Sequence, residues 1–168
     1  MLDITNKTKS STIGHRNYVF ISLLFAICCF GVFANCSLPR IIVLKDPLVP
    51  EEHLTLGVAY EKRGEVDPAI KEYKLASKKL PMAYLYLGNV YFQKGEFGEA
   101  EKNYREAIRK DPQNADVHNN LAWLYYTKRE NLDEAESLAL KALELNPSKG
   151  NIYRDTLEKI EELKKSNR

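Results

Sequence analysis

Apolar and small side chains recur every three or four positions between residues 51 and 147. This spacing places them on one face of an α-helix, and polar side chains fill most of the remaining positions. Glycine or proline interrupts the pattern at intervals, and a new stripe begins after each interruption. The pattern therefore predicts an all-α fold built from three pairs of amphipathic helices.

The predicted pairs repeat similar residue types in the same order. The first helix carries a leucine, a small residue and a tyrosine, and the second carries small residues around a tyrosine or alanine: Leu56-Gly57-Tyr60 with Ala69-Tyr73-Ala76, Leu87-Gly88-Tyr91 with Ala100-Tyr104-Ala107, and Leu121-Ala122-Tyr125 with Ala135-Ala139-Ala142. Small residues let two helices approach closely, and tyrosines fill the space beside them. Glycines are expected to end the first helices, and prolines to close the second helices: Gly64, Gly95, Pro81, Pro112 and Pro147.

This arrangement resembles the tetratricopeptide repeat family over roughly residues 50–147. The resemblance implies a helical-repeat solenoid with three helix-turn-helix repeats in residues 51–147. Residues 148–168 would then form a C-terminal capping helix and tail, with Ser148 as the N-cap. Such a helix covers the last apolar face of a solenoid.

Two departures from the regular repeat predict local changes. Gly88 and Ala122 are 34 residues apart, the period of the family, but Gly57 and Gly88 are only 31 apart. We therefore expect the loop between the first two repeats to be missing, with Pro81 ending one helix and starting the next. The third repeat has one extra residue between its helices, in a turn around residues 129–131 that contains no glycine.

The N-terminal 35 residues differ in composition from the rest. A polar stretch with a net positive charge precedes residues 18–34, which contain no charged side chain. A basic segment followed by an apolar core is typical of a signal sequence or an N-terminal membrane anchor, which we assign to residues 1–35. Residues 36–50 contain three prolines, which forbid a continuous helix, and are interpreted as a linker.

Three interpretations of the N-terminal segment stay open. It resembles a bacterial lipoprotein signal in which Cys36 becomes the lipidated first residue, although Asn35 departs from the small residue usual before that cysteine. It also fits ordinary signal cleavage after Ala34, or an uncleaved anchoring helix. Lipidation or retention would place the repeats in the bacterial cell envelope, facing the periplasm and tethered to a membrane.

Charge and motif content argue against catalysis and against nucleic-acid binding. The formal net charge is +2, but beyond residue 35 basic and acidic side chains are equal in number. A neutral domain has no electrostatic case for nucleic acid. The three histidines are scattered, every cysteine lies at or before position 36, and no nucleophile motif or phosphate loop occurs. We expect no enzyme activity, no small-molecule substrate, no cofactor and no metal.

The first helices of tetratricopeptide arrays line a concave groove that receives peptides or helices. Carried onto this chain, the resemblance predicts a peptide-binding groove rich in aromatic and amide side chains: Leu54, Val58, Tyr86, Asn89, Phe92, Asn119, Asn120, Trp123 and Tyr126. Asparagine can donate to and accept from a peptide backbone, and large aromatic residues add contact area at low entropic cost.

One recognition mode of the family is not expected here. Its chaperone-binding members hold a terminal carboxylate with a clamp of Lys, Arg and Asn. Parts of that clamp are replaced in this chain by Leu54, Val58, Tyr86 and Asp116. None of these four side chains carries the positive charge that attracts a carboxylate.

These features together predict a membrane-tethered scaffold that assists assembly or positioning of a protein complex in the cell envelope. An accessory or regulatory subunit of an enzyme carried on another chain is the alternative. A third hypothesis is a homo-oligomer whose groove takes the protein's own linker. Each requires a protein or peptide partner, and the scaffold hypothesis adds a membrane contact through the N-terminus.

Overall fold

The computed structural model describes residues 47–167 of the 168-residue chain. This range contains seven α-helices, one short 3₁₀ helix and no strand: α2 (Pro50–Lys62), α3 (Val66–Ala76), α4 (Met82–Gln93), α5 (Phe97–Lys110), α6 (Ala115–Lys128), α7 (Leu132–Leu145), η1 (Pro147–Lys149) and α8 (Gly150–Ser166). The predicted signal or anchor (1–35), Cys36 and most of the predicted linker lie outside the described residues. Between residues 47 and 167, no helix is both long and apolar enough to cross a membrane.

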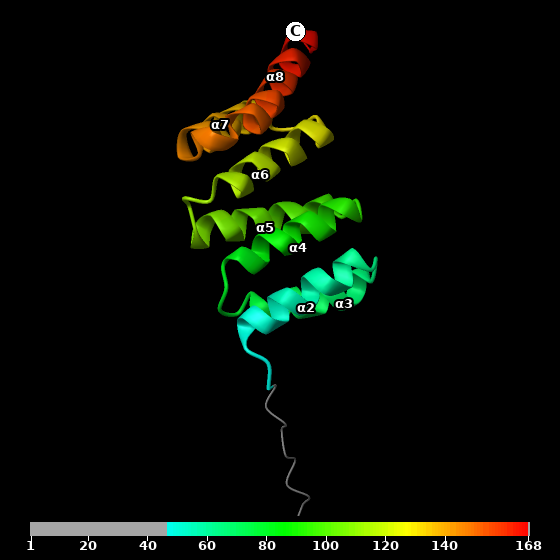
Figure 1. Cartoon of the computed structure of the whole chain (residues 1–168). Helices are drawn as coiled ribbons and strands as arrows, with labels where there is room; N and C mark the ends of the chain where they lie inside the picture. The colour runs from blue at the N-terminus through cyan, green and yellow to red at the C-terminus, as the bar shows by residue number, and fades with distance from the viewer. Residues whose placement is uncertain (1–46, 168) are drawn as a thin grey trace, which may run out of the picture. The chain divides into compact units, whose positions relative to one another are not determined.

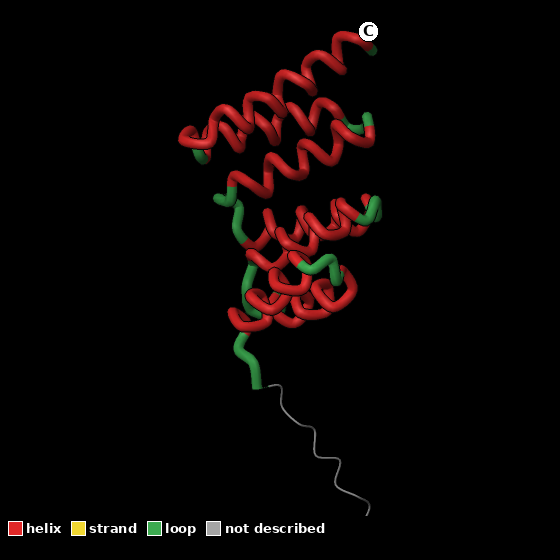
Figure 2. The backbone as a smooth tube through the Cα atoms, turned by 45° about the vertical axis from the view of Figure 1, so that its right-hand side comes forward, coloured by secondary structure: helices red, strands yellow, loops and turns green. Residues whose placement is uncertain are grey.

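The helices pack as antiparallel neighbours in chain order, α2 with α3, α4 with α5 and α6 with α7. Successive pairs stack on one another (Figure 1), and α8 lies against α7 and α6 at the end of the stack. Figure 2 shows the short loops that join the helices. The predicted all-α solenoid of three repeats and a C-terminal helix is confirmed.

One continuous core runs through the stack. Large side chains from successive helices are at most 2% exposed in it: Tyr73, Leu87, Tyr104, Leu121, Leu124, Tyr125 and Ile160. Complete burial of one such side chain stabilises the fold by about 1.5–3 kcal/mol. Because α3 to α8 all supply residues to this core, the three repeats and α8 depend on one another for stability.

The close approach of paired helices depends on glycine in the first two repeats. A Cβ added at Gly57 would lie 2.5 Å from the ring of Tyr73, and one at Gly88 would lie 2.3 Å from the ring of Tyr104. In the third repeat the second-helix position is Ala139, and the first-helix position is Ala122; both are fully buried. The smaller partner in α7 leaves room for the extra methyl group, so glycine is not needed there.

The turns inside the repeats use left-handed backbone. Gly64 and Gly95 adopt φ of 76° and 74°, as expected for glycines that end first helices. The third turn contains no glycine, and Arg129 and Asn131 take up left-handed values instead, with φ of 56° and 52°. A side chain at such a φ crowds the following carbonyl, so this turn is strained where the other two are not.

The short spacing between the first two repeats is accommodated inside a helix, and our expectation of a missing loop is wrong. α3 has 11 residues, whereas α5 and α7 each have 14. Residues 77–81 still connect α3 to α4, and Pro81 is the N-cap of α4 only. Removing about one turn from the C-terminal end of α3 keeps the stripe in phase, because a turn contains 3.6 residues.

The last helix begins slightly later than predicted. Ser148 lies in η1, where its hydroxyl donates to Asn146 Oδ1 at 2.5 Å, and Lys149 occupies the N-cap of α8. Ser148 is therefore not the N-cap, because the 3₁₀ turn formed by residues 147–149 precedes the helix. The domain boundaries proposed from the sequence otherwise stay predictions.

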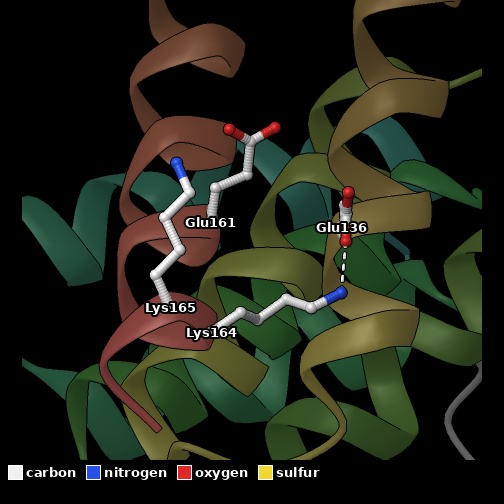
Figure 3. Close-up of a pocket in the computed structure, with 4 residues that line it drawn as sticks. All are labelled: Glu136, Glu161, Lys164 and Lys165. Atoms are coloured by element: carbon white, nitrogen blue, oxygen red, sulfur yellow. Dashed lines mark hydrogen bonds and ion pairs between the residues drawn. The ribbon is translucent and has the colours of Figure 1, made fainter. Parts of the chain in front are cut away.

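A polar cleft lies between α7 and α8 (Figure 3), and ion pairs across it help to hold the last helix in place. It is lined by Glu136, Glu161, Lys164 and Lys165. The Lys164 ammonium reaches across to α7, where it forms ion pairs with Glu136 and Asp133. These contacts raise the pKa of Lys164. The cleft thus contains a link between two helices, formed by Lys164 of α8 and Glu136 of α7.

Candidate functional site

The nine predicted groove residues lie on the first helices α2, α4 and α6, and we call this set the first-helix face. Eight of the nine are half-buried, with part of each side chain open to solvent: Leu54, Val58, Tyr86, Asn89, Phe92, Asn120, Trp123 and Tyr126. The ninth, Asn119, is only 7% exposed. The structure brings two pairs of these residues into direct contact, one of amides and one of aromatic rings.

The amide pair joins α4 to α6. Asn120 Nδ2 donates to Asn89 Oδ1 at 2.9 Å, and the Tyr104 hydroxyl donates to the same oxygen at 2.9 Å. Burial raises the pKa of Tyr104, so its hydroxyl is neutral and available as the donor. Two donors on one oxygen fix the orientation of the Asn89 amide. Its Nδ2 and the Asn120 Oδ1 are left without partners among residues 47–167.

The aromatic pair lies on α6 and is covered in part by α8. The rings of Trp123 and Tyr126 are tilted against each other with centroids 5.0 Å apart. Lys159 Nζ lies 5.5 Å from the centroid of the Trp123 ring, and the same ammonium is ion-paired with Asp155. The sequence pattern did not predict a role for Lys159, because its position on α8 is typical of a solvated charged face.

Asn119 has a different environment from the rest of the face. Its Oδ1 is buried and has no hydrogen-bond partner in the described part of the chain. Leucine occupies the matching place in the first two repeats, at Leu54 and Leu85. Leaving a buried acceptor unpaired costs about 1–3 kcal/mol. We therefore expect Asn119 to lower the stability of the fold; its side chain is buried, whereas that of its neighbour Asn120 is half-buried.

The part of the face near α2 is mainly apolar. Leu54 and Val58 pack against the core, and Tyr86 stacks on Tyr73 with ring centroids 5.2 Å apart. The Tyr73 hydroxyl donates to Glu61 at 2.5 Å. Burial and the Glu61 carboxylate raise the pKa of Tyr73. This edge offers few hydrogen-bonding groups compared with the amide pair.

The start of α6 is tied to the end of the stack through Asp116. Its carboxylate accepts from Lys149 Nζ at 2.7 Å and from the Tyr153 hydroxyl at 2.7 Å. Burial opposes ionisation of Asp116, but the hydrogen bonds from Lys149 and Tyr153 outweigh it and lower its pKa. Asp116 thus serves to hold η1 and α8 onto α6, a role that only the folded structure reveals.

Charged groups away from the first-helix face serve to join helices. Arg105 of α5 contacts the Tyr125 hydroxyl at 2.6 Å and Glu134 at 3.0 Å, and Glu101 accepts from Tyr125 at 2.8 Å. Burial of Glu101 is outweighed by these hydrogen bonds, which lower its pKa. At the start of the stack, His53 pairs with Glu72 at 2.7 Å. In the described range no group of His, Cys, Asp and Glu side chains could hold a metal ion.

Comparison with sequence families identifies the repeats. The profile described as "TPR repeat" matches residues 88–129, and the one described as "Tetratricopeptide repeat" matches residues 115–146. The chain contains tetratricopeptide repeats. These two matches together cover residues 88–146, most of the second and third helix pairs, and include both contact pairs of the first-helix face. No curated protein matches the sequence significantly.

Solved tetratricopeptide-repeat structures share this fold. The first TPR domain of human RPAP3 matches 70% of this chain and 96% of its own, with 23% identity and a TM-score of 0.63. The TPR2B domain of yeast Sti1, in complex with pHsp70, matches 67% and 96%, with 19% identity and a TM-score of 0.63. The Sgt2 TPR domain from Aspergillus fumigatus matches 71% and 82%, with 20% identity and a TM-score of 0.62. At this identity the likeness establishes the fold.

Proposed function

We propose that this tetratricopeptide-repeat protein is a scaffold that binds an extended segment of a partner protein across α4 and α6. The observation that carries the proposal is the oriented amide pair Asn89–Asn120. The pair leaves one donor (Asn89 Nδ2) and one acceptor (Asn120 Oδ1) unused. These two groups can bond the C=O and the N–H that a peptide unit offers. An extended segment exposes both groups along its length, whereas a helix satisfies them internally.

The surroundings of the amide pair favour an uncharged contact region. α4 contains no charged residue between Met82 and Gln93, and α6 contains none between Val117 and Thr127. Phe92 follows Asn89 after about one turn of α4, and Trp123 and Tyr126 on α6 add half-buried aromatic surface. Aromatic side chains of this kind are enriched at the centres of protein interfaces.

The expected partner differs from those of the chaperone-binding relatives. A related structure is the first TPR of Spaghetti (RPAP3) bound to the HSP90 peptide SRMEEVD, with 22% identity and a TM-score of 0.62 over 67% of this chain and 90% of that one. In this chain Leu54, Val58 and Tyr86 are uncharged, and Asp116 supplies a carboxylate that is already paired with Lys149 in place of a positive charge. We therefore propose a partner segment without a terminal carboxylate as its anchor.

The same proposal includes a tether. The apolar residues 18–34 and Cys36 support attachment to a membrane of the bacterial cell envelope, through a lipidated cysteine or an uncleaved N-terminal helix. Intact mass and fatty-acid labelling of the wild type beside Cys36→Ala test this part. Loss of label in the variant would support lipidation. An unlabelled full-length mass in both proteins would support an uncleaved anchor. A mature chain that begins at Asn35 and carries no lipid would refute the tether.

The binding surface is tested by capture from a detergent extract of envelope membranes. Asn89→Ala removes the oriented amide, and Trp123→Ala removes the centre of the aromatic surface. Leu140→Ala is the matched control, because Leu140 is a 50% exposed apolar residue on the second helix α7. We expect both face variants to lose the captured protein while the control keeps it.

Retention of the same partner by Asn89→Ala and Trp123→Ala, with unchanged circular dichroism, would refute binding at this face. Stoichiometric capture of a single enzyme would favour the alternative of an accessory subunit. The binding surface would then be the same, but the role of the protein would be to position or regulate that enzyme.

A further inference from the structure

We propose that the protein has a subsite for a basic side chain of the partner where α8 meets the first-helix face, formed by Trp123 and Tyr126 of that face and Asp155 of α8. In the free protein this subsite is filled by the ammonium of Lys159. The inference rests on the proposed function and adds to it the chemistry of one partner residue: an arginine, or more weakly a lysine, that displaces Lys159.

The three groups of the subsite suit a cation. Lys159 Nζ lies 5.5 Å from the centroid of the Trp123 ring, and the ring of Tyr126 packs against Trp123 at 5.0 Å. Tryptophan has the most favourable ring face for a cation, and a carboxylate beside it adds opposite charge. Asp155 supplies that carboxylate, since it forms an ion pair with Lys159 one helical turn away. Lys159 thus shows where a positive charge is stable.

The resident cation is held by weak contacts. The side chains of Lys159 and Asp155 are 38% and 61% exposed, and their ion pair joins positions i and i+4 of one helix. Exposed pairs of this kind contribute little, because water screens them and two flexible side chains must be ordered. The described residues give Lys159 no other charged partner. Displacing it therefore costs the fold little.

A partner's arginine would use the site better than Lys159 does. A guanidinium is planar, so it can stack on the indole of Trp123 while donating two parallel hydrogen bonds to the Asp155 carboxylate. A lysine ammonium is compact and strongly hydrated, and it cannot stack. The amide pair is one turn away on α6 at Asn120, so a segment held there would place a neighbouring side chain within reach of Trp123.

The test uses the full-length protein in detergent micelles and the fluorescence of Trp123, which is the only tryptophan of the chain. The probe is a blocked alanine pentapeptide with a central arginine. Its matched control carries citrulline, which has nearly the same shape but no charge. A saturable change in the Trp123 signal with the arginine peptide, and a much smaller one with citrulline, is the expected result.

Two variants make the test decisive. Lys159→Met keeps the apolar stem and removes the competing charge, so the arginine peptide should bind about threefold more tightly or better. Adding Asp155→Asn to Lys159→Met should weaken binding about fivefold. Equal binding of the citrulline peptide, no gain with Lys159→Met, no loss with Asp155→Asn, or no change in the Trp123 signal at all would each overturn the inference.

The inference and the proposed function can fail separately. If the arginine peptide binds as expected but the captured partner is retained by Asn89→Ala and Trp123→Ala, the subsite stands and the proposed function fails. If the partner is lost from those two variants but the arginine peptide shows no charge-dependent binding, the proposed function stands and the subsite does not.

Discussion

Replacing Arg129 by glycine should stabilise this protein. Arg129 is the C-cap of α6 and adopts φ 56° and ψ 34°, whereas the same turn in the first two repeats is made by Gly64 and Gly95. The Arg129 side chain is exposed, and no ion pair or side-chain hydrogen bond holds it within the described range. The substitution therefore changes backbone strain with little loss of contacts.

The magnitude follows from two opposing terms. A non-glycine residue in left-handed backbone costs about 1–2 kcal/mol. Glycine removes that strain but makes the unfolded chain more flexible, which costs about 0.4–1 kcal/mol. We expect a net gain of about 1 kcal/mol in the free energy of unfolding. For a folded unit of this size the gain corresponds to a rise in Tm of roughly 3–5 °C.

Urea and thermal unfolding followed by far-ultraviolet circular dichroism measure the effect. Arg129→Ala is the control for loss of the charged side chain, and it should give no comparable gain, because alanine keeps the Cβ that causes the strain. Gly95→Ala is the reciprocal control and should destabilise the protein by about 1 kcal/mol, since it puts a Cβ at φ 74°. Equal stability of the glycine variant and the wild type would refute the argument that the third turn is strained.

Three further predictions concern packing and charge. Asn119→Leu should raise the free energy of unfolding in urea by about 1–2 kcal/mol, because it replaces a buried acceptor that has no partner; a loss of stability would show that the amide is satisfied. Gly88→Ala should destabilise by about 3 kcal/mol, since its Cβ would overlap the Tyr104 ring, whereas Gly98→Ala, which meets nothing within 4 Å, should be neutral or slightly stabilising; similar effects of the two would contradict the packing argument. The lowered pKa of Asp116 stabilises the fold above the ordinary aspartate pKa of about 3.9, and this contribution disappears as the pH falls through the lower folded-state pKa. Asp116→Asn should therefore be less stable at neutral pH and lose less stability between pH values of about 5 and 2; parallel stability profiles would refute this role.

Most of the fold could be predicted because its determinants are local. The spacing of Leu87, Gly88 and Tyr91 in α4 predicts a helix with one small position on its packed face. The ring of Tyr104 in α5 packs against that position. Such a pattern repeats along the chain, so each repeat confirms the others. The wrong prediction of a missing loop between the first two repeats also comes from this local pattern. The sequence shows that the spacing from Gly57 to Gly88 is three residues shorter than the 34-residue period, but only the packing decides whether a loop or the end of a helix is shortened.

The candidate site was predictable as a set of positions but not as a set of contacts. Helical periodicity places Asn89, Asn119 and Asn120 on first helices, but it does not distinguish which of them are buried and which form hydrogen bonds. In the structure Asn120 bonds Asn89 while Asn119 is buried with an unpaired oxygen. The difference depends on which neighbouring helix covers each side chain, and that is a property of the stacking of repeats.

The sequence by itself determined the all-α class, the three helix pairs, the small residues at the helix crossings and the aromatic and amide composition of the first helices. These follow from the spacing and size of residues that are near one another in the chain. Only the tertiary structure decided the orientation of the Asn89 amide, the strain at Arg129 and the contact of Lys159 with Trp123. Each of these depends on groups brought together from different helices or on the geometry of one turn, and residue order alone does not fix such distances.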